Sequence, residues 1–304
     1  MDLVVQASRY PLAGETLAGT EFNMIPGGKG ANQAVAASRS GAATCMVGCV
    51  GQDAFGRVLL DSLSQAGVNV NGIHRLAKIS TGIASILVEE NGDNRIIIVP
   101  GANARVTEAV LSTEWEQIAG SSIVILQHEI PLATNHALIK RCQSEGIPVI
   151  LNPAPFYPIP QEILSAVDVL ILNTTETAAL AGIPVDGVEA AKQAARILYK
   201  NERQTVIITL GKAGAVLLNH DGQIHQPAFN VKPVDTTAAG DTFVGSFAAF
   251  MLAGRSAADS LHYATAASAI AVTRLGAQDS IPTRDEVEGF IKSYEVPVPP
   301  DARE

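Results

Sequence analysis

From about residue 120 onward, the pattern of hydrophobic positions predicts strands that alternate with helices. Short aliphatic runs are separated by segments with helical spacing, among them 131–145 and 189–200. Apolar strands separated by helices are typical of a parallel sheet that is covered on both faces. We therefore expect an α/β fold with a doubly wound, mainly parallel sheet and helices on both faces. The predicted strands of this body are 122–127, 147–151, 168–173, 205–210 and 215–218.

Two segments among the first hundred residues have a different pattern, which is rich in β signals. Two β-rich arms, 82–88 and 95–99, are joined by the sequence Glu-Asn-Gly-Asp-Asn, and an Asn-Gly turn between such arms predicts a hairpin. Residues 3–26 are also strand-like, with breaks at Pro11 and Gly14. We expect the regions of about 3–26 and 81–100 to form a small β lid within one domain that covers residues 1–304.

The composition is that of a globular chain, since hydrophobic residues make up 47% and charged residues 17% of its 304 residues. Its net charge of −9 disfavours a nucleic-acid or anionic-membrane partner. No charged leader and no membrane-length apolar stretch is evident. The three cysteines, Cys45, Cys49 and Cys142, are too few for a disulfide framework and are expected to be buried, reduced thiols. These features predict a soluble, cytoplasmic protein.

The segment with the most specific chemistry places Asp241 directly behind three small residues at a predicted helix start. Ala238, Ala239 and Gly240 carry almost no side chain, so a phosphate could approach their backbone amides closely. A carboxylate beside such an anion hole is suited to phosphoryl transfer to an alcohol. Taken alone, the same residues also describe an ordinary capped helix.

A second candidate is the glycine-rich segment Pro26-Gly-Gly-Lys-Gly-Ala-Asn-Gln-Ala34, which runs into a predicted helix at 31–39. It matches neither the GxGxxG nor the P-loop pattern, so it does not indicate a dinucleotide or Walker site. Its glycines allow close approach of a ligand, and Lys29 and Asn32 offer polar groups. Taken alone, the segment favours the simpler interpretation of a tight strand-to-helix turn.

Together, Gly27-Gly-Lys-Gly-Ala-Asn-Gln-Ala-Val-Ala36 and Asp235-Thr-Thr-Ala-Ala-Gly-Asp-Thr-Phe243 resemble the paired signatures of the PfkB family of sugar kinases. Two motifs about two hundred residues apart, in the family's order, are far more specific than either alone. Further segments resemble the ribokinase branch of the family, and the resemblance covers essentially the whole chain. These segments are Gln127-His-Glu-Ile-Pro131, Asn152-Pro-Ala-Pro155, Asn173-Thr-Thr-Glu176, Thr209-Leu-Gly-Lys-Ala-Gly214 and Ala271-Val-Thr-Arg-Leu-Gly-Ala-Gln278.

The resemblance implies ATP-dependent phosphorylation of D-ribose at O5, which gives D-ribose 5-phosphate and ADP. Asp241 is then the catalytic base, and the amides of the anion hole (Ala238, Ala239 and Gly240) stabilise the transferring phosphoryl group. The residues implied to bind the sugar are Asp2, Gly28, Lys29, Asn32, Glu129 and Asp241.

The family pattern also implies contacts with ATP, Mg²⁺ and K⁺. Asn173 and Glu176 would serve Mg²⁺ largely through water, although a helix N-cap with a first-turn carboxylate has the same spacing. The implied ATP contacts are Asn173, Thr209, Gly211, Gly214, Gly240 and Thr265. The implied K⁺ contacts are Asp235, Thr237, Ala271, the carbonyl of Arg274, Gly276 and Ser280. The family pattern also implies a homodimer formed through the lids; a monomeric lid is the alternative.

In one respect the sequence departs from the family pattern. Members usually begin with an apolar strand that ends in an Asn-x-Asp element, whereas here only Asp2 matches and the strand before it is missing. Either the true start lies upstream or this is a shortened form with impaired function. The missing strand leaves open a catalytically impaired sugar-binding protein. A separate alternative is another PfkB-type sugar or nucleoside kinase.

Overall fold

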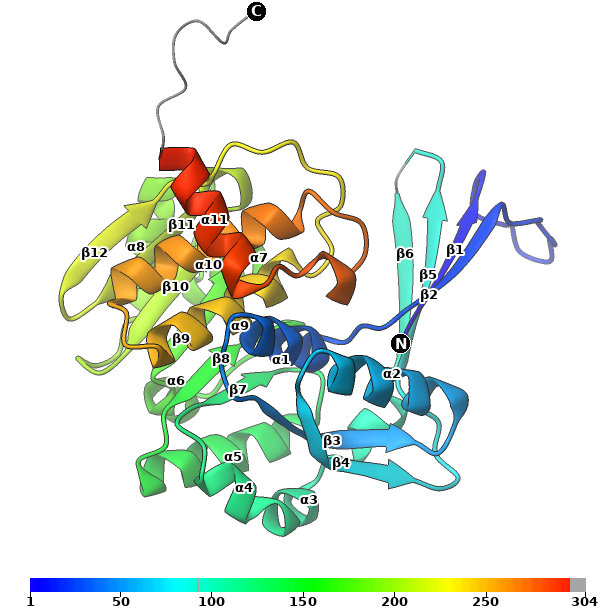
Figure 1. Cartoon of the computed structure of the whole chain (residues 1–304), viewed down its shortest axis with the longest axis horizontal. Helices are drawn as coiled ribbons and strands as arrows, with labels where there is room; N and C mark the ends of the chain where they lie inside the picture. The colour runs from blue at the N-terminus through cyan, green and yellow to red at the C-terminus, as the bar shows by residue number, and fades with distance from the viewer. Residues whose placement is uncertain (92, 296–304) are drawn as a thin grey trace, which may run out of the picture. The chain divides into compact units, whose positions relative to one another are not determined.

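The computed structural model describes residues 1–91 and 93–295, which form two compact units (Figure 1). The first unit comprises Met1–Ala34 and Thr44–Asp168, and the second comprises Val35–Ala43 and the described residues from Val169 onward. Helix α1 (Lys29–Arg39) contributes its first residues to one unit and its last residues to the other.

A four-stranded sheet, drawn in blue and cyan in Figure 1, contains both segments for which a β lid is expected. Its strand order is β2-β1-β5-β6; β1 pairs parallel with β5, and the outer pairs are antiparallel. The predicted hairpin forms, although residue 92 of its turn lies outside the described residues. The strands are β1 (Asp2–Ala7), β2 (Glu21–Ile25), β5 (Ile83–Glu89) and β6 (Asn94–Val99).

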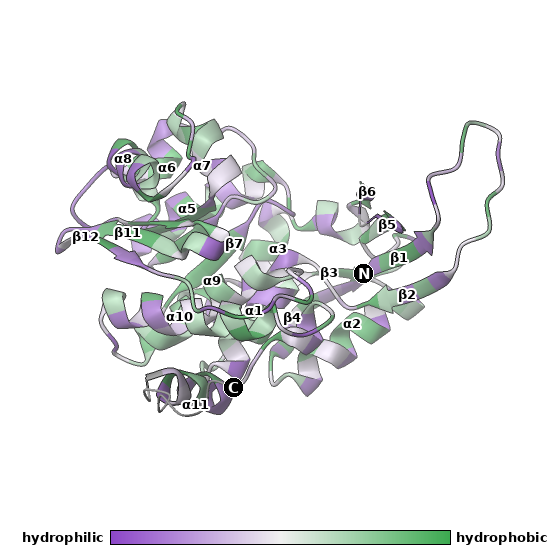
Figure 2. Cartoon of the chain, turned by 90° about the horizontal axis from the view of Figure 1, so that it is seen from above, coloured by the Kyte–Doolittle hydropathy of each residue, from purple (hydrophilic) through white to green (hydrophobic). Residues whose placement is uncertain are grey.

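This N-terminal sheet carries large apolar side chains that are exposed. The register aligns Met24, Leu3, Ser85 and Ile97 in one row across the four strands, so these side chains share a face. Met24 is 56% exposed and Ile97 is 69% exposed, and Phe22 on the same face is 57% exposed. An apolar patch of this kind marks an interaction surface more often than scattered single residues do. The loop between β1 and β2 extends well beyond the ends of these strands (Figure 2).

The rest of the first unit contains two parallel strand pairs, β3 with β4 and β7 with β8. The strands are β3 (Cys45–Gly51), β4 (Asn69–Leu76), β7 (Val124–Gln127) and β8 (Val149–Asn152). The helices are α2 (Ala54–Gln65), η1 (Gly101–Arg105), α3 (Glu108–Thr113), α4 (Trp115–Ala119), α5 (Leu132–Glu145) and α6 (Gln161–Ala166).

The cysteines are free thiols, but the prediction that all three are buried is wrong for Cys45, which is exposed. Cys45 is the first residue of β3, and an irregularity in the strand register lies between Cys45 and Val47. The extra residue of this irregularity lies in β4, between Asn69 and Gly72, and Cys45 is exposed at the end of β3 where the pairing begins. Cys49 and Cys142 are buried, and burial raises the pKa of Cys142 to about 11. Both buried thiols are therefore protonated and unreactive at neutral pH.

In the second unit the strand order is β12-β11-β10-β9, and β9 pairs parallel with β10. The sequence pattern placed 215–218 in the parallel series, but β11 runs antiparallel to β10. The reason is the connection, since only the short turn η2 (Gly211–Ala213) joins the two strands and a parallel neighbour needs a long crossover. The strands are β9 (Val169–Asn173), β10 (Thr205–Thr209), β11 (Ala215–Asn219) and β12 (Gly222–Gln226).

Helices cover both faces of these strands, as the α/β expectation requires. In Figure 2, α7 and α8 lie on one side of β11 and α9 and α10 lie on the other. The strands between them are fully buried at Leu170, Leu172 and Ile207. None of the helices within the described residues is long and apolar enough to span a membrane. The helices are α7 (Thr174–Ala181), α8 (Val188–Leu198), α9 (Ala239–Leu252), α10 (Ala257–Ala271), η3 (Gln278–Ser280) and α11 (Arg284–Glu295).

Candidate active site

The residues predicted to bind the sugar, apart from Asp241, lie together in the first unit. The Lys29 amide donates to Glu129 Oε2 at 2.9 Å. A Cβ atom on Gly28 would lie 3.8 Å from the same oxygen, and one on Gly27 would lie 2.3 Å from Asp2 Oδ2. We call this group, Asp2, Gly28, Lys29, Asn32 and Glu129, the Glu129 cluster. It places two carboxylates beside the glycine-rich turn.

The α-amino group of Met1 is close enough to both of these carboxylates for their charges to affect its pKa. It donates to the carbonyl of Gly82 at 3.0 Å. Burial lowers the pKa of this amino group, and the negative charges of Asp2 and Glu129 act in the opposite direction. Asp2 and Glu129 therefore belong to one electrostatic neighbourhood in the first unit.

The glycine-rich segment is a strand-to-helix turn, and it also forms part of the Glu129 cluster. Gly28 has a φ of 96°, in the left-handed region that favours glycine. Its carbonyl accepts a hydrogen bond from the amide of Asn32 at 2.9 Å. This is the first hydrogen bond of helix α1. Asn32 is only 5% exposed, so its side chain lies inside the unit. The strand-to-helix turn is thus confirmed, and the binding of a ligand by this segment stays a prediction.

Helix α9 in the second unit begins without a side-chain cap. Its N-cap residue is Ala238, which makes no side-chain cap hydrogen bond. The ordinary alternative, a side-chain-capped helix start, is therefore not what forms. Asp241 lies in the first turn and is 6% exposed. A buried carboxylate thus lies in the same turn as amides that have no acceptor within the helix.

The backbone of this turn is strained at Ala238, which has a φ of 58° although it is not a glycine. Such a conformation costs on the order of 1 kcal/mol and is concentrated at functional sites. Its carbonyl accepts the amide of Thr242 at 2.8 Å. The amide of Ala239 is 3.3 Å from the carbonyl of Thr236, a long hydrogen bond that a phosphate oxygen could replace.

The carboxylate of Asp235 joins this turn to the loop at Gly276 through hydrogen bonds. Its Oδ1 accepts both the amide and the hydroxyl of Thr237, at 2.9 and 2.6 Å, and its Oδ2 accepts the amide of Gly276 at 3.0 Å. Burial acts to raise the pKa of Asp235, but these hydrogen bonds outweigh it and lower the pKa below the usual value. Asp235 is therefore ionised at neutral pH. Three of the residues predicted to contact K⁺, namely Asp235, Thr237 and Gly276, are thus joined by hydrogen bonds of the Asp235 carboxylate.

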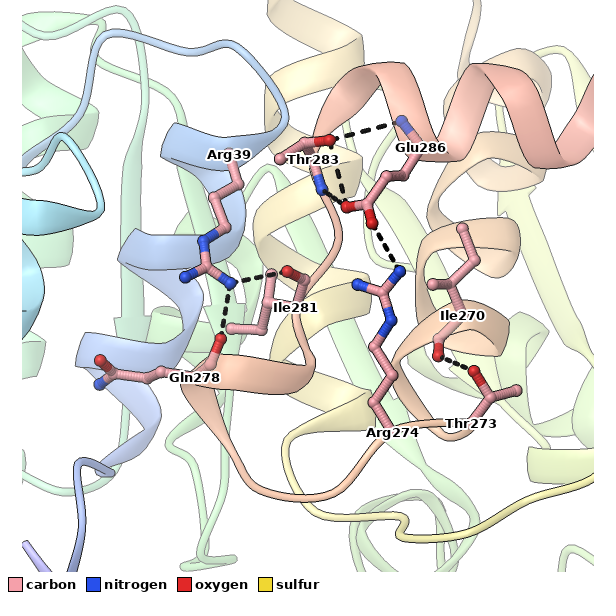
Figure 3. A network of polar contacts seen from close by, with 8 residues as sticks. All are labelled: Arg39, Ile270, Thr273, Arg274, Gln278, Ile281, Thr283 and Glu286. Atoms are coloured by element: carbon pink, nitrogen blue, oxygen red, sulfur yellow. Dashed lines mark hydrogen bonds and ion pairs between the residues drawn. The ribbon is translucent and has the colours of Figure 1, made fainter.

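The loop that carries the other predicted K⁺ contacts is held by two arginines (Figure 3). Arg274 Nη2 lies 2.6 Å from Glu286 Oε1, so its side chain is engaged with α11. Arg39 Nη1 donates to the carbonyls of Gln278 and Ile281 at 2.8 and 2.7 Å. Within the same loop, Ser280 Oγ donates to the carbonyl of Ala277 at 2.8 Å. The loop is thus fixed on both sides of Ser280.

Asn173 and Glu176 form the capping box that the sequence left open as an alternative. Asn173 Oδ1 accepts the Glu176 amide at 2.9 Å, and Glu176 Oε2 accepts the Asn173 amide at 3.0 Å. These bonds fix the two groups at the start of α7, directly after β9. This capping box is compatible with a hydrogen bond to Mg²⁺-bound water, because the side-chain amide and the carboxylate each carry a second polar atom.

The predicted nucleotide loop follows β10, and glycine is required in it for steric reasons. Gly214 has a φ of 91°, and a Cβ atom there would lie 2.0 Å from the carbonyl oxygen of Gln226. The hydroxyl of Thr209 donates to the carbonyl of Leu172 at 3.3 Å. Thr265 donates to the carbonyl of Leu261 at 2.7 Å. Both threonine hydroxyls therefore have backbone acceptors within the second unit.

The predicted residues thus fall into two groups, one in each unit. The first unit holds the Glu129 cluster, and the second holds Asp241 with the anion-hole turn and the predicted nucleotide and cation residues. No group of three or more His, Cys, Asp or Glu side chains that could hold a metal occurs among the residues described. Sequence reasoning did not assign a role to three amides near the Glu129 cluster, Gln33, Gln127 and Asn152. The only sequence signal for them is a polar side chain within, or directly after, a predicted strand or helix.

The model of the family described as "pfkB family carbohydrate kinase" matches residues 1–284. This chain belongs to that family. The chain is also 41% identical to the ribokinase of Bacillus subtilis over 291 residues, which cover 96% of each protein. It is 33% identical to the deoxyribokinase of Salmonella typhi, covering 97% of each protein.

Among solved structures, the chain is similar to Arabidopsis thaliana ribokinase complexed with ribose and ATP, with a TM-score of 0.90 and 34% identity. That alignment covers 96% of this chain and 95% of the plant protein chain. The ribokinase-like α/β fold expected from sequence is thereby confirmed, and the chain is a carbohydrate kinase.

Proposed function

We propose that this protein phosphorylates D-ribose at O5 with ATP, giving D-ribose 5-phosphate and ADP. The observation that carries this proposal is the uncapped start of α9, where buried Asp241 shares the first turn with the backbone amides. The high identity to ribokinases over nearly the full chain supports ribose as the sugar. The Arabidopsis ribokinase structure, whose title names ribose and ATP, supports the same pair of substrates.

In the proposed reaction, Asp241 accepts the proton of the O5 hydroxyl as O5 attacks the γ-phosphorus of ATP. A new O5–P bond forms, the bond from the γ-phosphorus to the β,γ-bridging oxygen breaks, and ADP leaves with the electron pair of that bond. Amides of the Ala238–Gly240 turn hold the charge of the transferring group, because the positive end of the α9 dipole lies there. The residues of the Glu129 cluster bind the other hydroxyl groups of the sugar.

We propose Mg²⁺ and K⁺ as the ions that this reaction uses. Mg²⁺ bound with ATP neutralises phosphate charge, and Asn173 and Glu176 would hold its water ligands. K⁺ needs a site made of oxygen donors. Asp235 is ionised and fixed by its hydrogen bonds to Thr237 and Gly276, and the backbone carbonyls of the adjoining loop are oxygen donors too. These donors fit a monovalent cation that raises activity.

The test is a coupled assay of ADP release over D-ribose, 2-deoxyribose, fructose and a nucleoside, in KCl and in NaCl. We expect the highest kcat/KM for D-ribose and higher activity in KCl. A preference for 2-deoxyribose would favour the activity named for the Salmonella typhi relative. Thermal stabilisation by ribose without ADP release would instead indicate a sugar-binding protein. Since ATP and phosphorylated sugars are cellular metabolites, we propose a cytoplasmic location.

We also propose that the exposed face of the N-terminal sheet forms a homodimer interface with a second copy. Replacing Ile97 or Met24 by Glu puts a charge into this face, which we expect to convert a dimer into a monomer. Light scattering of the purified protein measures the change in mass. Val58→Glu is the control, because Val58 is 44% exposed but lies on helix α2. A monomeric wild-type protein would contradict this part of the proposal.

Gly27→Ala should weaken ribose binding without unfolding the protein. The added methyl group would overlap the carboxylate of Asp2, which is the end of a mobile side chain and is expected to move aside. Because Asp2 is proposed to bind a ribose hydroxyl, we expect the KM for ribose to rise by about tenfold while the KM for ATP stays the same. Steady-state kinetics measure both constants. An unchanged ribose KM would show that the position of Asp2 does not matter.

A further inference from the structure

Three amide side chains link helix α1 to the ends of two strands behind the Glu129 cluster. Gln127 Nε2 donates to Gln33 Oε1 at 2.6 Å, and Gln33 Nε2 donates to Asn152 Oδ1 at 3.1 Å. Gln33 is 1% exposed and Asn152 is 9% exposed. Gln127 and Asn152 are register partners at the last positions of β7 and β8. We call Gln33, Gln127 and Asn152 the amide relay.

The relay attaches the first turns of α1 to the same strand end that carries Glu129. The Lys29 amide bonds to Glu129, and one helical turn later the Gln33 side chain bonds to Gln127, two residues before Glu129. The two contacts therefore join the start of α1 to the segment 127–129 at two separate points. Asn32 lies between them in sequence, within the part of α1 that these two contacts hold.

Two further contacts restrict Gln127. Asn135 Nδ2 donates to the backbone carbonyl of Gln127 at 2.7 Å. A Cβ atom on Gly30 would lie 3.0 Å from Gln127 Oε1, so glycine at position 30 lets the amide of Gln127 approach the helix closely. The side chain of Gln127 thus lies against α1, while its backbone carbonyl is held by α5.

Hydrophobic side chains of similar size could fill this space, and burying amides is favourable only when their hydrogen bonds are made. A chain of satisfied amides selects one arrangement of the elements that it joins, since each donor and acceptor requires a direction. The relay therefore fixes the relative positions of α1, β7 and β8 more than it stabilises the folded state. The geometry that it sets is the distance between the Gly28–Asn32 turn and Glu129.

We propose that Gln33 is a positioning residue for the sugar, acting through Gln127 and Asn152 on the Glu129 cluster. This inference rests on the proposed function, because the Glu129 cluster is the proposed ribose site. Gln33 does not touch the reacting atoms. It sets the position of the Gly28–Asn32 turn relative to the carboxylate of Glu129, so that both can bind hydroxyl groups of the same sugar.

The test compares full-length Gln33→Met, Gln127→Met, the double variant and wild type in steady-state kinetics. Methionine keeps the volume but removes the amide. We expect each single variant to raise the ribose KM by about tenfold, with kcat and the ATP KM much less affected. The double variant should resemble the worse single variant, because both remove the same link. Gln117→Met, which removes a partly buried amide elsewhere in the first unit, is the control with an unchanged ribose KM.

Three results would overturn the proposal: an unchanged ribose KM in Gln33→Met, equal increases in the KM of ribose and ATP, or effects of the two single variants that multiply in the double variant. Thermal unfolding shows whether each variant is folded. If Gln33→Met does not fold, Gln33→Glu is used, since it keeps the acceptor for Gln127 and loses the donor to Asn152. If wild type prefers another sugar, the proposed function fails, and the same comparison with that sugar still tests the relay.

Discussion

Asp241→Asn should leave a folded protein that binds ribose and ATP but turns them over about a hundred to ten thousand times more slowly. The reason is that asparagine has nearly the same shape as aspartate but cannot accept the O5 proton. Asp241 is 6% exposed, so a substitution that kept its volume less well would disturb the start of α9. The measurement is kcat for ribose phosphorylation, together with calorimetric binding of both substrates.

The matched control is Asp259→Asn, in the first turn of the neighbouring helix α10. Asp259 bonds to the capping residue Ser256, so its loss of charge affects the first turn of a side-chain-capped helix outside the proposed site. We expect nearly wild-type kcat for this variant. If Asp241→Asn kept more than about a tenth of the wild-type rate, Asp241 would not be the base, because general base catalysis contributes far more.

Glu129→Ala should raise the KM for ribose by roughly ten- to a hundredfold, which corresponds to the loss of one or two hydrogen bonds to a charged group. The Glu129 carboxylate accepts the Lys29 amide, so its removal also releases the turn that is proposed to bind the sugar through its backbone. The KM for ATP should stay the same. Steady-state kinetics with each substrate varied in turn measure this difference.

Glu114→Ala is the control for the loss of a half-buried carboxylate in the first unit. Glu114 Oε1 lies 2.8 Å from His74 Nε2, away from the Glu129 cluster in sequence. This variant should lose some thermal stability and keep its ribose KM. Equal changes in the ribose KM of both variants would mean that Glu129 acts through general stability, which would contradict its role in binding.

The parts of the fold that were predicted correctly depend on local patterns. The helix predicted at 131–145 forms as α5 (Leu132–Glu145), and the arms of the hairpin form as β5 and β6. Strand direction was harder, because β11 follows β10 in sequence like the parallel strands before it. The short η2 connection was the signal that distinguishes the two cases. Strand β12 was missed although the sequence His220-Asp-Gly222 before it is a turn signal.

The candidate site was predictable where short motifs carry it. The turn before Asp241 and the glycine-rich segment were both found from sequence, since each has its chemistry within a few consecutive residues. Two features could not be predicted. The left-handed φ of Ala238 has no local signal, because alanine rarely adopts it. The amide relay joins Gln33 to Asn152 across 119 positions, and only the folded arrangement of strand ends brings such residues together.

The central claim, phosphorylation of ribose at O5, is tested most directly by identifying the product. Wild-type protein is incubated with D-ribose, ATP, MgCl₂ and KCl, and the product is examined by phosphorus and carbon NMR. We predict a single phosphate monoester whose phosphorus couples to C5 of ribose, formed in equal amount to ADP. Phosphate on another ribose oxygen, or ADP formed without any ribose phosphate, would contradict the account.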